Sequence, residues 1–166
     1  GFDQRRNNIF RVRTFENNLK KFFKSKHALC VSSGTAAIKI ALKACGVKRG
    51  DEVITQAFNF IATVEAILDV GAIPIITNID ESLNMCPDDL RKKITPKTKA
   101  VILVSANGRY PTAGLDRFKD LCREHEITLI EDAAQSLGSY YPDGIHIGLK
   151  GSVGSFSFSA PKIIST

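Results

Sequence analysis

The feature of this sequence that most restricts its fold is the alternation of short apolar stretches with longer amphipathic ones. The short stretches are rich in Val, Ile and Leu and are nearly continuous in apolar character, which predicts β-strands buried on both faces. These predicted strands occupy residues 27–33, 51–56, 72–77, 99–105 and 127–132, and alternating Phe and Ser residues predict a last strand at 155–159. Strands of this kind are typical of a parallel sheet.

The amphipathic stretches between the strands predict helices. Apolar residues recur there at helical spacing, and Pro or Gly stands at several of the expected helix ends. The predicted helices cover residues 34–45, 60–71, 87–94 and 112–125. Strands that alternate with helices predict an α/β fold, here a three-layer domain whose mostly parallel sheet has helices on both faces. A chain of 166 residues is long enough for one such domain.

Composition narrows the class of protein further. No apolar run approaches the ~20 residues of a membrane-spanning helix, and residues 1–8 lack the apolar region of a signal peptide. The cysteines Cys30, Cys45, Cys86 and Cys122 are scattered, and the histidines form no metal-binding pair. We therefore expect free thiols in a reducing compartment, no metal site and no membrane partner, which indicates a cytoplasmic protein.

Positive charge is concentrated in residues 1–26. The net charge is +6, and this segment holds eight Lys or Arg against two acidic residues. Such a basic arm suits nucleic acid or a phosphorylated ligand. The alternative is the solvated face of an amphipathic helix, because Phe15, Leu19, Phe22 and Phe23 recur at helical spacing. We favour the helix and expect no nucleic-acid partner, since no nucleic-acid-binding motif is present.

Polar chemistry follows three of the predicted strands at the point where each strand ends. SSGTAA follows the first strand, DAAQ begins where the strand at 127–132 ends, and SAPK follows the last strand. Ligands of parallel α/β sheets bind outside the carboxyl ends of the strands. We therefore expect these three segments to form the functional site.

Each segment has a functional and a structural interpretation. SSGTAA leaves free N–H groups at a helix N-terminus, where phosphate binds, but the same residues also form an ordinary helix cap. The motif is neither an ATP P-loop nor a dinucleotide fingerprint. Asp132 either caps the next segment or faces a cation, such as the pyridinium nitrogen of pyridoxal phosphate. Lys162 is either an exposed side chain or, among apolar neighbours, an amine suited to Schiff-base chemistry.

Taken in order, the motifs resemble those of one enzyme family. GTAA, DEVITQAFNFIAT, GAIPI, LIEDAAQSLG and GSFSFSAPK look like segments of the DegT/StrS-type nucleotide-sugar aminotransferases, which are fold-type-I enzymes that use pyridoxal 5′-phosphate. The resemblance extends from about Phe15 to the end of the chain, and one departure is Ser105, where relatives often carry His. It implies that residues 27–166 form a pyridoxal-phosphate-binding large domain of the aspartate aminotransferase type, preceded by the basic arm and helix at 1–26.

The resemblance implies that two residues carry the catalysis. Lys162 would hold the cofactor in a Schiff base and move a proton, and Asp132 would pair with the nitrogen of the cofactor ring. Gln135 would approach the ring hydroxyl. Because Asp132 and Gln135 are three residues apart, both reach one cofactor only if the chain turns after the strand.

The remaining cofactor contacts are also implied by the resemblance. Gly34, Thr35 and Ala36 would hold the phosphate from a helix N-terminus, and Ser157 would add a hydroxyl. Phe60 would stack on the pyridine ring. The alternative for Phe60 is core packing, because FNFIAT begins an apolar helix.

The implied activity is transfer of an amino group from glutamate to a nucleotide-linked keto-sugar, in the synthesis of amino sugars and cell-surface polysaccharides. Some close members of the family carry His at the lysine position and act as sugar dehydratases, so Lys162 favours amino transfer. A non-catalytic binding module is the alternative from another class.

We further expect this chain to be part of a longer protein. It begins with Gly rather than Met, and two isoleucines follow Lys162 just before the sequence ends. Members of the family continue into further strands and a small C-terminal domain, and they form homodimers whose partners complete each cofactor site. We therefore expect the 166-residue chain to be inactive as an aminotransferase by itself.

Overall fold

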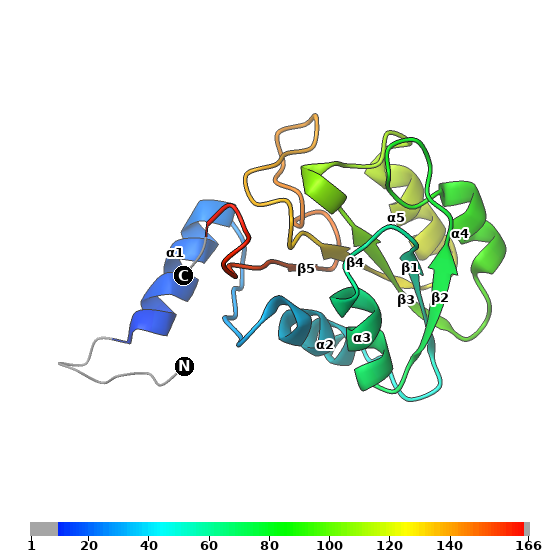
Figure 1. Ribbon diagram of the computed structural model, residues 1–166, viewed down its shortest axis with the longest axis horizontal. Helices are drawn as coiled ribbons and strands as arrows, with labels where there is room; N and C mark the ends of the chain where they lie inside the picture. Colours follow the sequence, from blue (N-terminus) through cyan, green and yellow to red (C-terminus); the bar gives the residue numbers. More distant parts are fainter. Residues whose placement is uncertain (1–9, 165–166) are drawn as a thin grey trace. The chain divides into compact units, whose positions relative to one another are not determined.

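The computed structural model describes residues 10–164 of a chain that divides into two compact units, Gly1–Ser32 and Ser33–Thr166. The first unit contains helix α1, Arg11–Phe23 (Figure 1), which confirms the helix expected in this region. The helix ends at Lys24, whose left-handed backbone (φ 51°) turns its N–H toward the last carbonyls of the helix. Phe15 and Phe22 of α1 are exposed.

The strand predicted at residues 27–33 is wrong. The structure shows no strand in this stretch. A strand persists only when its backbone groups pair with a neighbouring strand. The N–H of Cys30 instead donates to Glu16 Oε1 of α1 at 2.9 Å. No strand among the described residues pairs with residues 27–33. The apolar sequence pattern alone therefore does not make this stretch a strand.

The second unit is built on a parallel sheet that has five strands within the described residues. In chain order these are β1 Glu52–Gln56, β2 Ile73–Thr77, β3 Thr98–Val104, β4 Thr128–Asp132 and β5 Val153–Ser155. Their spatial order is β2-β1-β3-β4-β5, and every neighbouring pair is parallel (Figure 1). The predicted strands from 51–56 to 127–132 are confirmed to within one residue at each end.

The last strand lies earlier in the chain than the pattern predicted, so the range 155–159 is wrong. β5 ends at Ser155. Phe156 turns toward the core, where its ring lies 5.7 Å from the ring of His146. The chain then continues without strand pairing as far as Lys162, whose N–H donates to Ser159 O at 2.9 Å. Most of the alternating Phe and Ser residues thus lie beyond the last strand, with the ring of Phe156 partly buried against the core.

Helices cover both faces of the sheet (Figure 1). α2 Gly34–Ala44 and α3 Ala62–Asp69 lie on one face, and α4 Pro87–Lys93 and α5 Leu115–Glu124 lie on the other. A short 3-10 turn, Ala106–Gly108, follows β3. Successive strand residues point to opposite faces. The predicted three-layer α/β fold is confirmed, and no helix among residues 10–164 is long and apolar enough to cross a membrane.

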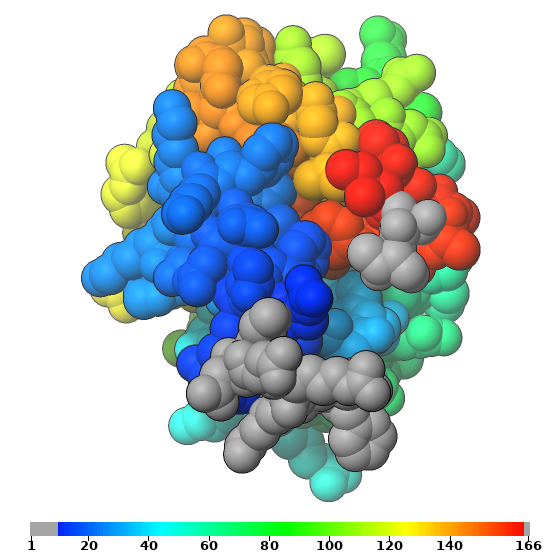
Figure 2. All heavy atoms as spheres, turned by 90° about the vertical axis from the view of Figure 1, so that its left-hand side faces the viewer, coloured from blue at the N-terminus to red at the C-terminus, as the bar shows by residue number. Residues whose placement is uncertain are grey.

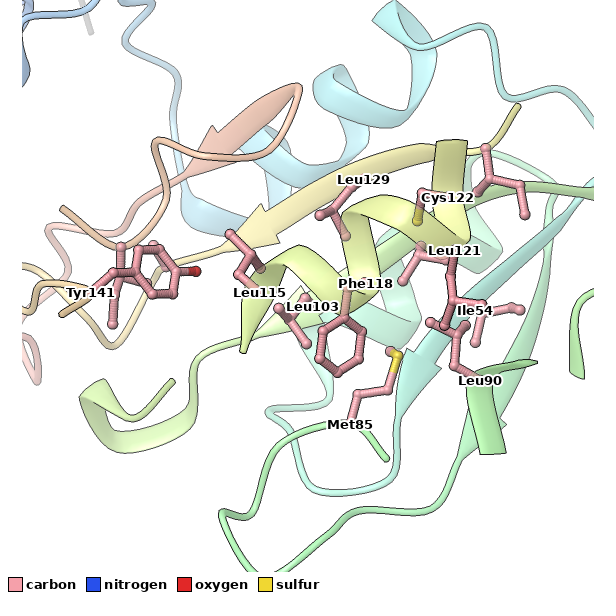
Figure 3. Packing of buried hydrophobic residues seen from close by; sticks show 14 residues of the cluster. Ile54, Met85, Leu90, Leu103, Leu115, Phe118, Leu121, Cys122, Leu129 and Tyr141 are labelled. Atoms are coloured by element: carbon pink, nitrogen blue, oxygen red, sulfur yellow. The ribbon is translucent and has the colours of Figure 1, made fainter. Parts of the chain in front are cut away.

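The core beneath α4 and α5 gives the sheet a rigid base. Phe118 of α5 is fully buried, and Figure 3 shows its ring close to Met85 in the same cluster. Burying a side chain of this size stabilises the fold by roughly 1.5–3 kcal/mol. Val101 and Leu103 of β3 belong to this core, whereas Ile102 belongs to the core beneath α2 and α3.

After β1 the chain adds β2 on one side of it, and from β3 onward it adds strands on the other side, so the strand order reverses between β1 and β3. Open α/β sheets commonly bind ligands at such a switch point. The side chain of Gln56, at the end of β1, bridges the neighbouring segments. Its Nε2 donates to Phe58 O (3.0 Å) and Leu83 O (3.2 Å), and its Oε1 accepts from Val104 N (3.2 Å). A single buried glutamine therefore joins three segments at this point.

Candidate functional site

The site begins with Asp132, the last residue of β4. Its side chain faces α3, where Thr63 Oγ1 donates to Asp132 Oδ2 at 2.8 Å. Ala134 N donates to Oδ1 at 3.1 Å, and Ser155 Oγ lies 3.5 Å from the same oxygen. Asp132 thus caps the turn after the strand, as one interpretation predicted, and the carboxylate is fixed from three directions.

Burial controls the electrostatics of this carboxyl group. Asp132 is almost fully buried, and burial raises its pKa. Hydrogen bonds from Thr63 and Ala134 and the positive charge of Lys162 act in the opposite direction. A buried carboxyl with a raised pKa gains free energy when a cation reaches it, because the cation offsets the cost of desolvation.

Thr63 is a site residue that the sequence did not reveal. It lies one position inside α3 and its hydroxyl is buried against Asp132. The two residues are 69 positions apart, so no local pattern links them. A sequence signal existed only in the form of a polar residue on the apolar side of a predicted helix.

The N-terminus of α2 lies beside Ser157. A Cβ atom placed on Gly34 would be 3.3 Å from the Cβ of Ser157 and 3.5 Å from its hydroxyl. Gly34 therefore lets a hydroxyl approach the start of a helix closely. The predicted phosphate contacts Gly34, Thr35 and Ser157 are thus brought together.

Ala36 differs from its two predicted neighbours. Its N–H donates to Ser33 Oγ at 3.1 Å, because Ser33 caps the helix. The amide of Ala36 is therefore engaged in the cap of α2. The N–H groups of Gly34 and Thr35 belong to the first helical turn, which has no intrahelical acceptor for them.

Lys162 follows β5, the strand that pairs with β4, which Asp132 ends. Burial raises the pKa of Asp132, and the positive charge of Lys162 acts against this effect. Its side chain is partly exposed, and the neighbouring Ile163 and Ile164 are 72% and 56% exposed. The end of the described chain, drawn in red, is at the surface in Figure 2. The structure therefore places the predicted pair of catalytic residues at one edge.

Gln135 lies in the turn that follows β4. The expected turn is present, because Ser136 N donates to Ala133 O at 3.0 Å. Gln135 Oε1 accepts from Asn107 N at 2.9 Å, which leaves its Nε2 as a donor for the predicted ring hydroxyl.

Phe60 lies just before α3 and is 64% exposed. The core-packing alternative for Phe60 is therefore wrong. An exposed aromatic beside the carboxyl edge has a face available for a ligand, and its stacking role remains a prediction.

Ser105 marks the departure from the family pattern. Its N–H donates to Asp132 O at 3.1 Å and its carbonyl accepts from Ser136 Oγ at 2.7 Å. Its buried hydroxyl meets no partner in hydrogen-bonding geometry within the described residues. The backbone of Ser105 thus supports the site, and its side chain has no assigned role.

Comparison with known proteins decides the family. The model of the DegT/DnrJ/EryC1/StrS aminotransferase family matches residues 6–166. The chain belongs to this family. The resemblance seen in the sequence is therefore confirmed over nearly the whole chain.

The relatives in sequence and in structure agree with this family. GDP-perosamine synthase of Vibrio cholerae is 40% identical over 153 residues, which cover 92% of this chain and 41% of that protein. The aminotransferase from Psychrobacter cryohalolentis superposes with a TM-score of 0.87 at 34% identity, covering 93% of this chain and 38% of that one. An E. coli GDP-4-keto-6-deoxy-D-mannose-3-dehydratase with bound hydrated PLP has a TM-score of 0.84 at 28% identity, with coverages of 93% and 41%. The chain thus spans about two fifths of the length of these relatives.

Proposed function

We propose that the protein carrying this chain transfers an amino group from glutamate to a nucleotide-linked keto-sugar, with pyridoxal phosphate as its cofactor. The observation that carries the proposal is that Asp132 ends β4, while Ser157 and Lys162 follow the neighbouring parallel strand β5, with Ser157 beside the N-terminus of α2. Membership of a family of aminotransferases supports it.

The residues present fit pyridoxal phosphate. The missing Cβ of Gly34 opens a space beside the Ser157 hydroxyl, where a phosphate meets a helix N-terminus. Asp132 is buried and acquires a favourable partner when a protonated ring nitrogen reaches it. Gly34, Thr35 and Ser157 would hold the phosphate, and Ala36, whose N–H is engaged by Ser33 Oγ, would only line the same helical turn.

When bound, pyridoxal phosphate supplies an electron sink for the reacting carbon of the amino donor. Asp132 would keep the proton on the ring nitrogen, and Gln135 would donate to the ring hydroxyl. The amine of Lys162 would bind the cofactor covalently and, once displaced by glutamate, move the proton at Cα of the donor. Phe60 would cover one face of the ring.

Lys162 also separates amino transfer from dehydration. The family resemblance associates His at this position with sugar dehydratases, and this chain carries Lys.

In the protein carrying this chain, Asp132→Asn should keep the cofactor bound and slow amino transfer sharply, because the amide does not enforce protonation of the ring. Near-normal turnover in that variant would contradict the role of Asp132.

The first experiment tests cofactor attachment. The purified chain is mixed with pyridoxal phosphate, reduced with borohydride and digested, and the modified lysine is located by mass spectrometry. We expect the adduct on Lys162 and its loss in Lys162→Ala. The matched control is Lys119→Ala, on the opposite face in α5 and paired with Asp116. An adduct on another lysine would contradict the proposal, and absence of any adduct in the parent would favour a non-catalytic module.

We further expect this chain alone to bind the cofactor weakly and to be inactive. The partial exposure of Lys162 and the exposure of Phe60 and Ile163 support this, because such chemistry needs fixed geometry and excluded water. The assay follows release of 2-oxoglutarate from glutamate with a panel of nucleotide keto-sugars. Robust turnover would contradict it.

We also propose a cytoplasmic homodimer for the protein carrying this chain. Four free cysteines support a reducing compartment. Exposed apolar side chains near the carboxyl edge, at Phe58, Phe60 and Ile61, support a partner surface. Sedimentation of the protein carrying this chain tests the dimer, and a monomer at micromolar concentration would contradict it.

A further inference from the structure

Glu131 is a fully buried acidic residue that the proposed chemistry does not use. It precedes Asp132 on β4, so its side chain points to the opposite face of the sheet, toward the core that contains Leu129 and Tyr141. Figure 3 shows Tyr141 at one end of that core. A buried carboxyl group is costly unless its oxygens are satisfied, so its surroundings are informative.

Both oxygens of Glu131 are fully engaged. Oε2 accepts from Tyr141 Oη–H at 2.6 Å and from Gly148 N at 2.9 Å. Oε1 accepts from Lys150 N at 2.6 Å and from Gly151 N. All four donors belong to residues 141–151, within the connection that leads from β4 to β5 (orange in Figure 1). The Glu131 carboxylate therefore holds four donors of residues 141–151 together at one point.

The segment 141–151 packs directly against β5 and against Phe156, the residue that follows β5. A Cβ on Gly154 would lie 1.9 Å from Gly148 O, so these two backbones touch. A Cβ on Gly148, whose φ is +96°, would lie 2.6 Å from the ring of Phe156. Gly148 therefore lies directly against the Phe156 ring. The next residue is Ser157, which lies against Gly34.

We propose that Glu131 is a positioning residue that fixes the path of the chain from β5 through Ser157 toward Lys162. The contacts run from Glu131 to Gly148, then to Gly154 and Phe156, and so to the residue after Phe156. The functional consequence rests on the function proposed above, in which Ser157 and Lys162 hold the cofactor.

The test compares Glu131→Gln with Tyr141→Phe in the purified chain. Gln replaces an acceptor oxygen by an NH₂ group, which then faces N–H or O–H donors, whereas Phe removes one donor and leaves the other three bonds intact. The measurements are amide hydrogen exchange along the chain and the dissociation constant for pyridoxal phosphate.

In Glu131→Gln we expect exchange at Gly148, Lys150 and Gly151 to rise at least about tenfold, the scale of a lost bond to a buried donor. Exchange in residues 154–157 should rise with it, while exchange in β1 and β3 stays unchanged. The dissociation constant should rise about tenfold as well. Tyr141→Phe should give smaller changes at the same positions, and it tests the same coupling if the glutamine variant does not fold.

Two results would overturn the proposal. One is a uniform rise in exchange over the whole sheet, which indicates a general loss of stability. The other is a local rise at 148–151 with exchange at 154–157 and cofactor affinity unchanged. If the parent chain takes up no cofactor on Lys162, the proposed function fails, but the exchange measurements still decide whether Glu131 controls the path beyond β5.

Discussion

Thr63 Oγ1 donates a hydrogen bond of 2.8 Å to Asp132 Oδ2, and it does so from a different element of the fold. Replacing Thr63 by Val keeps the shape of the side chain and removes the donor. We expect the pKa of Asp132 to rise further and stability to fall by about 1–3 kcal/mol, because a buried oxygen loses its partner. NMR of the side-chain carboxyl carbon of labelled Asp measures the pKa, and urea unfolding measures the stability. Thr63→Ser should restore both, and an unchanged Asp132 titration in the valine variant would contradict the role.

Gly34→Ala tests the space beside Ser157. The new Cβ would be 3.3 Å from the Cβ of Ser157, so one of the two must give by a few tenths of an ångström. We expect affinity for pyridoxal phosphate to fall by on the order of 1 kcal/mol, about fivefold, with thermal stability unchanged or slightly raised because Ala favours a helix. Spectral titration and thermal melting measure these. In a Ser157→Gly background, Gly34→Ala should cost less affinity than it does in the parent, because the Cβ that the new methyl group meets is gone. Equal affinity in the parent and Gly34→Ala would exclude this space as the phosphate site.

Phe60→Ala separates ligand stacking from packing. Because Phe60 is 64% exposed, its loss should leave the thermal midpoint nearly unchanged. We expect affinity for the cofactor to fall by ~1 kcal/mol, the scale of an aromatic contact beyond burial. Phe58→Ala is the matched control, since Phe58 is also exposed and belongs to the same proposed partner surface but has no proposed contact with the cofactor. A loss of stability without a loss of affinity would count against stacking.

Cys122 gives a prediction about alkaline pH. Burial raises the pKa of its thiol to about 12, from a reference value of 9.0. Between these values the folded chain keeps a proton that the unfolded chain releases, so stability should fall as pH rises, by up to about 1.4 kcal/mol per pH unit from this group. Urea unfolding from pH 8 to 11 tests this against Cys122→Ala, which should be less stable at pH 8 but show a shallower slope. Parallel slopes in the two proteins would contradict the assignment.

Most of the fold could be predicted from the sequence, because the spacing of apolar residues and the length of each apolar stretch are local properties of the chain. The strands β1 to β4 and all the helices of the second unit could be placed in this way. The two failures concern stretches whose state depends on a distant partner. Residues 27–33 meet no neighbouring strand among the described residues, and Phe156 is drawn from the sheet edge by the core around His146.

The site was predicted in part for a related reason. Asp132 ends β4, GTAA begins α2 and Lys162 follows β5, and the ends of elements are features that a sequence displays locally. The residues that orient them are not displayed in this way. Thr63 and Glu131 act through hydrogen bonds to partners brought close only by folding, so no local pattern announced them.

Gln56, at the point where the strand order reverses, has a consequence for how the protein folds. Its amide joins positions 27 and 48 residues away along the chain. Because contacts between such distant positions close long loops, we expect this bridge to form after the folding barrier is crossed. Gln56→Ala should therefore accelerate unfolding and leave the refolding rate nearly unchanged in stopped-flow experiments, whereas a matching loss in the refolding rate would place this bridge in the folding nucleus. Gln56 would then slow unfolding and so lengthen the lifetime of the native state, with little effect on the folding rate.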